Sequence, residues 1–210
     1  MKLQYFVTIL AFSLFSFGIR PALAQAEPNH DVRDITVGMP VDEIPNAGYV
    51  NLTCANDTSR KIPEWSSWRE CPPDADAMHA IRFEFDPETS REGTLVAGHP
   101  VILTALIDDK GMVAGLKIDT DPKARLYLRK KAFLLGVQVK SRYGSEGWAC
   151  VQRQPESGEQ PVGGVYIREN CRKAVQGRVL VVERDLFRRP DQDARNFVDE
   201  TQVKITSEVK

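Results

Sequence analysis

The chain has 210 residues, a length that fits one domain or two small ones. It contains 28 Lys and Arg and 29 Asp and Glu, so its formal net charge is -1 at pH 7. This balance argues against a nucleic-acid-binding protein, which needs a basic face to displace counterions from phosphate. With 42% hydrophobic and 27% charged residues, the composition also excludes a disordered chain.

The first 24 residues have the pattern of a signal peptide. Lys2 supplies a positive charge, residues 6–17 form an apolar stretch of 12 residues, and Ala22-Leu23-Ala24 is a small-x-small cleavage site. A membrane-spanning helix needs about 20 apolar residues, so cleavage is predicted and no membrane span. The leader is typical of bacterial export, and we therefore expect a periplasmic protein.

The mature chain is expected to form one domain. Residues 25–33 are polar and are predicted to be a flexible N-terminal segment. Residues 34–210 are predicted to form a single domain, with two similar halves at 34–120 and 137–210 as a further possibility. In each half an aromatic residue precedes a cysteine, a polar stretch, a second cysteine and a strand.

Four cysteines follow the predicted leader: Cys54, Cys71, Cys150 and Cys171. An even number in an exported protein indicates two disulfides. Of the three possible pairings we favour Cys54–Cys71 and Cys150–Cys171, because each pair encloses one polar, loop-like stretch. Each bond would remove about 3 kcal/mol of unfolded-state entropy. A redox or metal site is the alternative, but the sequence has no C-x-x-C pair and no His at zinc-finger spacing.

Alternating apolar and polar residues predict mostly short strands. The clearest local feature is a hairpin between residues 101–107 and 112–118, joined by a turn that ends in Gly111. A helical turn is expected at 40–44, and residues 55–78 are too rich in prolines for a long regular element. Other strands are expected at residues 34–38, 49–54, 80–85, 137–143, 148–152, 165–168, 178–187 and 202–209.

One main helix is predicted at residues 122–135. Asp121 suits the N-cap, Pro122 suits the first helical position, and Gly136 is expected to end the helix. Apolar residues on two faces predict that it is covered on two sides. The predicted fold class is therefore α+β, with one or two antiparallel sheets of short strands packed on this helix and held by two disulfides.

Residues 35–40 (ITVGMP), followed by Asp42-Glu43-Ile44, resemble the opening of the small outer-membrane-assembly lipoproteins, in which a Gly-Met step precedes a helix. The resemblance covers these residues alone. The chain lacks the lipid-anchoring cysteine of that family, and Pro45 shortens the expected helix. We assign no family from it.

The sequence contains no nucleophile elbow, H-E-x-x-H, P-loop or dinucleotide fingerprint. The leading hypothesis is a non-enzymatic binding or accessory protein that presents disulfide-tied loops to an envelope protein or glycan. Trp65, Trp68 and Arg69 are the candidate contacts, because Trp residues at i and i+3 of a helical turn point the same way and Trp and Arg dominate interfaces. The alternative is that both indole rings cover the disulfide and the end of the sheet.

A small-ligand or copper-type metal carrier is a second hypothesis, although no cofactor is expected under the first. Met78, His79 and His99 offer thioether and imidazole ligands, and Asp74 and Asp76 could add oxygen ligands. These residues have no metal-motif spacing, and ordinary histidines beside a packed methionine are the simpler interpretation. A secreted hydrolase with a dispersed site is a third hypothesis, because members of a catalytic triad can be distant in sequence.

Overall fold

The structure, a computed structural model, describes residues 30–190 and 196–208. The predicted signal peptide and residues 25–29 lie outside the described residues, as do residues 191–195 and 209–210. No helix in the described part of the chain is long and apolar enough to cross a membrane.

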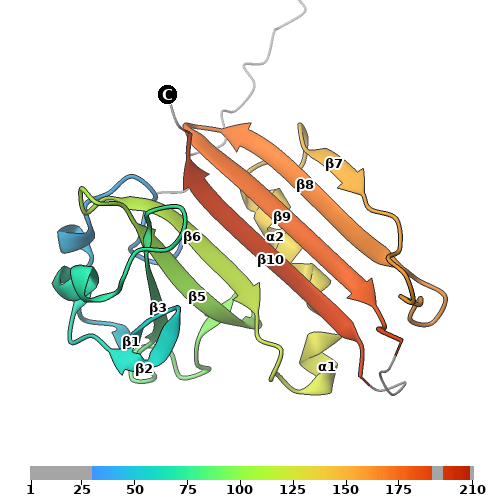
Figure 1. The fold of residues 1–210 in the computed structure, drawn as a ribbon, viewed down its shortest axis with the longest axis horizontal. Coiled ribbons are helices and arrows are strands. Elements are labelled where there is room, and N and C mark those ends of the chain that lie inside the picture. Colours follow the sequence, from blue (N-terminus) through green and yellow to red (C-terminus); the bar gives the residue numbers. More distant parts are fainter. Residues whose placement is uncertain (1–29, 191–195, 209–210) are drawn as a thin grey trace, which may run out of the picture.

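The described chain forms one antiparallel sheet of ten strands (Figure 1). Nine of them follow the order β2-β1-β3-β5-β6-β10-β9-β8-β7, and β4 pairs with β5 beside this path. The antiparallel arrangement confirms the predicted strand-rich fold, but five of the strands have 8 to 10 residues and are longer than the short strands of the predicted fold class. The strands are β1 (Tyr49–Cys54), β2 (Asp57–Lys61), β3 (His79–Phe85), β4 (Leu95–Val96), β5 (His99–Ile107), β6 (Val113–Thr120), β7 (Ala149–Gln152), β8 (Ile167–Val175), β9 (Arg178–Phe187) and β10 (Val198–Ser207).

The hairpin predicted around Gly111 is confirmed by β5 and β6. Gly111 has a φ of +80°, which is the left-handed conformation that a turn of this kind needs. Strand β9 has the bounds predicted from its alternation. Strand β8 is longer than the strand predicted at 165–168. The prediction missed most of it because charged residues lie on both faces of β8, so apolar and polar residues do not alternate along it. The segment 34–38 forms an isolated bridge between Val32 and Ile35 and no strand.

The single helix predicted at residues 122–135 is wrong. The chain forms two shorter helices, α1 (Leu126–Arg129) and α2 (Phe133–Arg142). Gly136 lies inside α2, and a Cβ atom there would stand 3.2 Å from the Val182 side chain of β9. The glycine therefore lets the helix approach the sheet and does not end the helix.

Residues 137–143, predicted as a strand, form the second half of α2 and its C-cap. Val137 and Val139 suggested alternation, but Val137 is 53% exposed while Leu135, Val139 and Tyr143 are buried. The buried positions are thus spaced by four residues, as on one helix face. The true end of the helix is marked by Gly144, whose φ is +90°.

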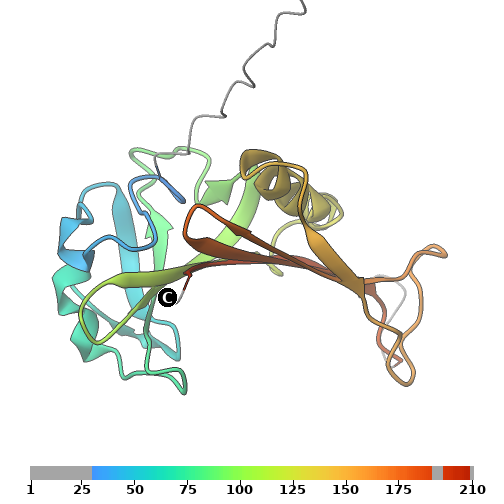
Figure 2. The same ribbon diagram turned by 90° about the horizontal axis from the view of Figure 1, so that it is seen from above.

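One face of the sheet forms the core. A row of directly paired residues crosses from Phe83 on β3 to Cys171 on β8, and every member is buried. Helix α2 covers this face over β9 and β10, while the 3-10 helices η1 (Val41–Glu43) and η2 (Trp65–Glu70) lie in the other half (Figure 2). The row consists of Phe83, Leu103, Ile118, Val203, Val182 and Cys171.

Both predicted disulfides are confirmed. The Cys54–Cys71 bond joins the end of β1 to the C-cap of η2, and both of its cysteines are fully buried. The Cys150–Cys171 bond joins directly opposed residues of β7 and β8. The predicted division into two similar halves stays a prediction.

Candidate functional site

The two tryptophans chosen from the sequence lie in the core. Trp65 is 1% exposed, and its ring packs edge-on against Phe83 with centroids 5.1 Å apart. Trp68 is 2% exposed and packs against the His79 ring at 4.7 Å, while the Arg69 guanidinium lies 3.9 Å from the Trp68 ring. Of the three candidate contacts, only Arg69 is exposed. Their role in partner binding stays a prediction.

The structure does not bring Met78, His79 and His99 together. His79 begins β3 and is paired with Ile107, whereas His99 begins β5 eight residues before Ile107. At about 3.3 Å per residue the two histidines are roughly 26 Å apart along the sheet. His79 Nδ1 donates to the backbone carbonyl of Cys71 at 2.6 Å, so one imidazole nitrogen is already engaged.

Asp74 and Asp76 belong to the loop before β3. The Asp74 carboxylate accepts backbone N–H groups of Asp76 and Met78, both at 2.9 Å, so it stabilises its own turn. His99 is 2% exposed, and burial lowers its pKa although Asp199 and Asp121 act in the opposite direction. The proposed ligands therefore do not form one metal site in this structure.

The face of the sheet opposite α2 carries a groove. Among residues 30–190 and 196–208, no helix or strand packs on this face over β9 and β10 (Figure 2). Three adjoining pockets, of about 350, 260 and 470 Å³, share Lys204 and lie side by side across β6, β10, β9 and β8. We call them the open-face groove. It is lined chiefly by Asp74, Asp76, Met78, Lys117, Asp119, Arg172, Ala174, Val179, Val181, Glu183, Gln202, Lys204 and Thr206.

A basic row crosses this face from strand to strand. Lys117 on β6 is the direct Cα partner of Lys204 on β10, and Lys204 is in turn paired with Val181, which is paired with Arg172. Like charges placed directly opposite each other destabilise a sheet by about 0.2–1 kcal/mol. Among the described residues neither lysine has an ion pair within 4.0 Å, so two adjacent ammonium groups face the groove without a bound carboxylate.

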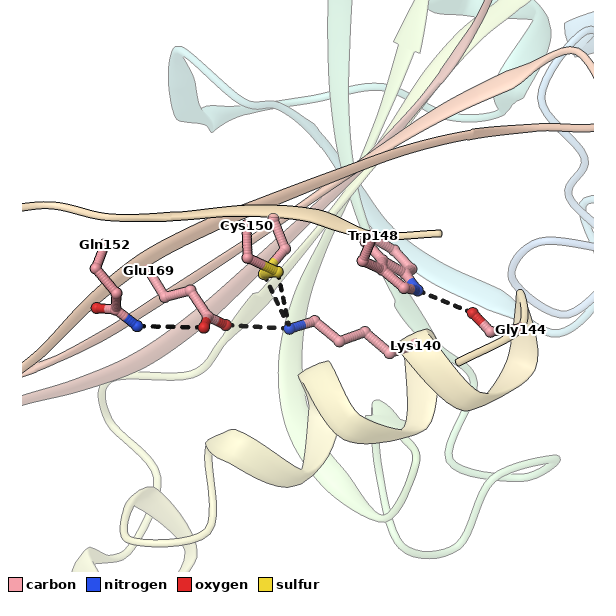
Figure 3. Close-up of a disulfide and its surroundings, with 7 residues drawn as sticks. Lys140, Gly144, Trp148, Cys150, Gln152 and Glu169 are labelled. Carbon is pink, nitrogen blue, oxygen red and sulfur yellow. Dashed lines mark hydrogen bonds and ion pairs between the residues drawn. A yellow bond between two sulfur atoms is a disulfide. The ribbon is translucent and has the colours of Figure 1, made fainter. Parts of the chain in front are cut away.

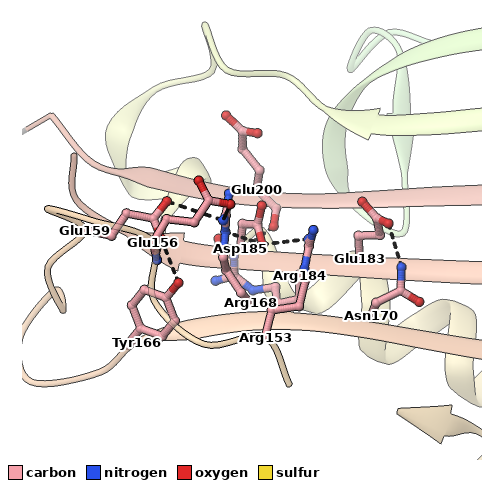
Figure 4. Close-up of polar contacts among 10 residues, drawn as sticks. All are labelled: Arg153, Glu156, Glu159, Tyr166, Arg168, Asn170, Glu183, Arg184, Asp185 and Glu200. Atoms are coloured by element: carbon pink, nitrogen blue, oxygen red, sulfur yellow. Dashed lines mark hydrogen bonds and ion pairs between the residues drawn. The ribbon is translucent and has the colours of Figure 1, made fainter. Parts of the chain in front are cut away.

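An acidic and amide row runs parallel to the basic row. Asp119 is paired with Gln202, Gln202 with Glu183, and Glu183 with Asn170. These residues stand two positions along each strand from the basic row, so they project on the same side. Asn170 donates to Glu183 at 2.6 Å across the strands (Figure 4).

Asp119 is partly buried within this row. Burial raises the pKa of its carboxyl group; Lys117 opposes that rise and Glu200 adds to it. Raised carboxyl pKa values gather at ligand-binding and catalytic sites, because such groups are held out of water. The groove thus combines a desolvated carboxyl group with a neighbouring pair of lysines.

A network around Arg168 closes one end of this face (Figure 4). The Arg168 guanidinium contacts Glu156, lies 3.5 Å from Glu159 and 3.9 Å from Asp185. Tyr166 donates to Glu159 at 2.7 Å, and burial together with this bond raises the tyrosine pKa to about 12. The network fixes the 153–166 loop to β8 and β9.

Sequence reasoning did not find the groove. Its only local signals are the polar residues at alternate positions, such as Lys117 with Asp119 and Gln202 with Lys204. Alternation of this kind marks any solvated strand face. The groove depends on the register that places Lys117 opposite Lys204. That register comes from the pairing of β6 with β10, two strands that are far apart in sequence.

No family model, curated protein or solved structure matches the chain.

Proposed function

We propose that this is an exported binding protein whose open-face groove holds an extended, charged segment of a protein partner. The observation that carries the proposal is the pair of parallel rows of opposite charge, with the unpaired lysines Lys117 and Lys204 at its centre. A fold that keeps two like charges in direct opposition gives up stability, and such local conflicts are typical of functional positions.

The spacing of the rows fits an extended peptide. Residues i and i+2 of a strand are about 6.6–6.8 Å apart and point to the same side, in the sheet and in a peptide alike. A peptide parallel to the strands would therefore place an acidic side chain over Lys117 and Lys204 and a basic side chain two residues on, over Asp119 and Glu183. None of the described residues that line the groove is aromatic, so a stacking platform for sugar rings is not provided.

The disulfides support the compartment in this proposal. Two bonds and no free cysteine among the described residues suit an oxidising environment such as the periplasm. The segment that leads from Cys71 to β3 also contributes to the groove, because its residues Asp74, Asp76 and Met78 line the edge of the groove. The binding face thus replaces the buried tryptophans as the surface offered to a partner.

Fluorescence anisotropy with labelled peptides tests the proposal. The probe is a Gly-rich peptide with repeated Glu-x-Lys pairs, and its controls carry only Glu, only Lys, or the same charges at i and i+1. We expect the Glu-x-Lys probe to bind best. We expect Lys117→Glu with Lys204→Glu to weaken binding about tenfold, which corresponds to two lost and reversed surface ion pairs.

The matched control is Arg60→Glu with Lys61→Glu, which makes the same change in charge on the exposed strand β2, at the other end of the sheet. Equal losses in both double variants would show that net charge and not the groove attracts the probe. If the protein binds an oligosaccharide of sugar acids and none of the peptides, the proposal of a protein partner is wrong and the partner is a glycan.

A further inference from the structure

The second disulfide lies at an edge of the sheet (Figure 3). Strand β7 is the last strand in the sheet order, and all four of its residues are exposed. Cys150 on β7 is exposed, whereas its partner Cys171 on β8 is 0% exposed. The two halves of the bond therefore differ, because one cysteine is open to approach and the other is enclosed.

A lysine of α2 stands directly beneath this bond. Lys140 Nζ is 3.0 Å from Cys171 Sγ and 4.0 Å from Cys150 Sγ (Figure 3). The same ammonium group forms an ion pair with Glu169 at 3.0 Å, and Glu169 also accepts from Gln152 at 3.2 Å. The ion pair with Glu169 holds the Lys140 ammonium group near Cys171 Sγ. The positive charge of Lys140 offsets the negative charge of the Glu169 carboxylate beside that sulfur.

An ammonium group beside a sulfur atom favours its thiolate form. In thiol–disulfide exchange the departing sulfur leaves as a thiolate, and a better stabilised thiolate leaves faster. Lys140 lies nearer to Cys171 than to Cys150. The arrangement therefore favours attack on the exposed Cys150 with Cys171 as the leaving group.

We propose that Cys150–Cys171 is a site of thiol–disulfide exchange with a dithiol protein of the envelope. One thiolate of the dithiol attacks Cys150 Sγ, the bond to Cys171 breaks, and Cys171 departs as a thiolate beside Lys140. The second thiol of the dithiol, deprotonated, attacks the mixed disulfide and releases Cys150. Two electrons pass to this protein, and the dithiol becomes a disulfide.

The fold tolerates this step at one bond and not at the other. Release of β7 uncovers little of the core, because none of its four residues is buried. Cys54 and Cys71 are both 0% exposed, so neither sulfur of that bond is open to attack, whereas Cys150 is exposed. The Cys54–Cys71 bond is therefore an internal control within the same molecule.

The experiment follows reduction of the oxidised full chain by dithiothreitol under native conditions. Free thiols are alkylated at set times, and each cysteine is quantified by peptide mass spectrometry while circular dichroism reports the fold. We expect Cys150 and Cys171 to be labelled at least about tenfold faster than Cys54 and Cys71, without loss of structure. We expect Lys140→Gln to slow that reduction about threefold to tenfold, and Lys130→Gln, at an exposed residue, to leave it unchanged.

The direction of the Lys140→Gln effect separates an electrostatic role of the ammonium group from a merely structural role of the lysine in holding α2. A variant that merely loosened α2 would expose the bond and speed its reduction, whereas loss of the ammonium group slows it. Simultaneous reduction of both disulfides, unfolding together with the first reduction, or an unchanged rate in Lys140→Gln would each overturn the proposal.

Discussion

Replacing Lys173 by Met tests how the end of α2 is fixed to the sheet. Lys173 projects from β8, and its Nζ donates to the backbone carbonyls of Tyr143, Gly144 and Glu146 at 2.7, 2.9 and 2.7 Å. The ammonium group thus satisfies carbonyls at the C-terminal end of the helix, where the helix dipole also favours a positive charge. Methionine keeps the length of the side chain and removes only the charge and the donors.

The expected loss is about 2 kcal/mol in the free energy of unfolding. A hydrogen bond from a charged group contributes about 1.5–3 kcal/mol, and three bonds from one partly buried ammonium group do not add in full. A favourable charge at a helix C-terminus contributes about 0.3–1 kcal/mol, part of which is the same interaction. Together these figures centre on about 2 kcal/mol, which changes the folding equilibrium about thirtyfold.

Urea unfolding, followed by circular dichroism, measures this difference. The midpoint should fall while the m-value stays constant, because the same surface is exposed on unfolding. Lys61→Met is the matched control, since Lys61 is exposed on β2, makes no ion pair within 4.0 Å among the described residues and should change stability by less than about 0.5 kcal/mol. Equal, small effects of the two substitutions would refute the role given to Lys173.

Three further predictions concern the core and its response to pH. Trp65→Ala should cost about 3–5 kcal/mol in urea unfolding, because the ring is 1% exposed; a loss below about 1 kcal/mol would show that the ring is not part of the core. Gly136→Leu should lower stability by about 1–3 kcal/mol despite the better helix propensity of Leu, and equal stability would contradict the close approach of α2 to Val182. Burial lowers the pKa of His99 in the folded protein. The contribution of the neutral imidazole to folding stability is therefore complete above the unfolded pKa of about 6.5. As the pH falls below that value the contribution is lost, by up to about 1.4 kcal/mol per pH unit. Chemical unfolding at pH 7.5 and 5.5 should therefore show a smaller difference in His99→Gln than in the wild type, and an unchanged difference would assign the pH dependence to other groups.

Much of the strand pattern could be predicted, because it is local. The hairpin around Gly111 and strand β9 follow from alternation and turn chemistry within each segment. The helix was predicted wrongly because a glycine looks the same in sequence whether it ends a helix or lets it approach a sheet. At Gly136 the second role applies, and only the position of Val182 on β9 reveals it.

The candidate site could not be predicted, because it depends on register. Lys117 and Lys204 are 87 positions apart in sequence, and nothing near either one indicates that they are neighbours. Trp65 and Trp68 are predicted contacts because Trp is frequent at interfaces, but large apolar rings near a disulfide are equally suited to the core. Both disulfides were predictable, since each joins cysteines separated by a short polar stretch.

The two ends of the sheet also bear on how the protein avoids aggregation. Exposed strand edges pair with other chains unless they are short or charged. Strand β2 at one end is fully exposed and rich in polar residues, and β7 at the other end has only four residues, although its Val151 is 64% exposed. If reduction frees β7, the edge that remains is β8, whose charged residues include Arg168, Glu169, Arg172 and Lys173. These charges would keep the newly uncovered edge from serving as a template for intermolecular sheets, so the reduced protein should stay dispersed.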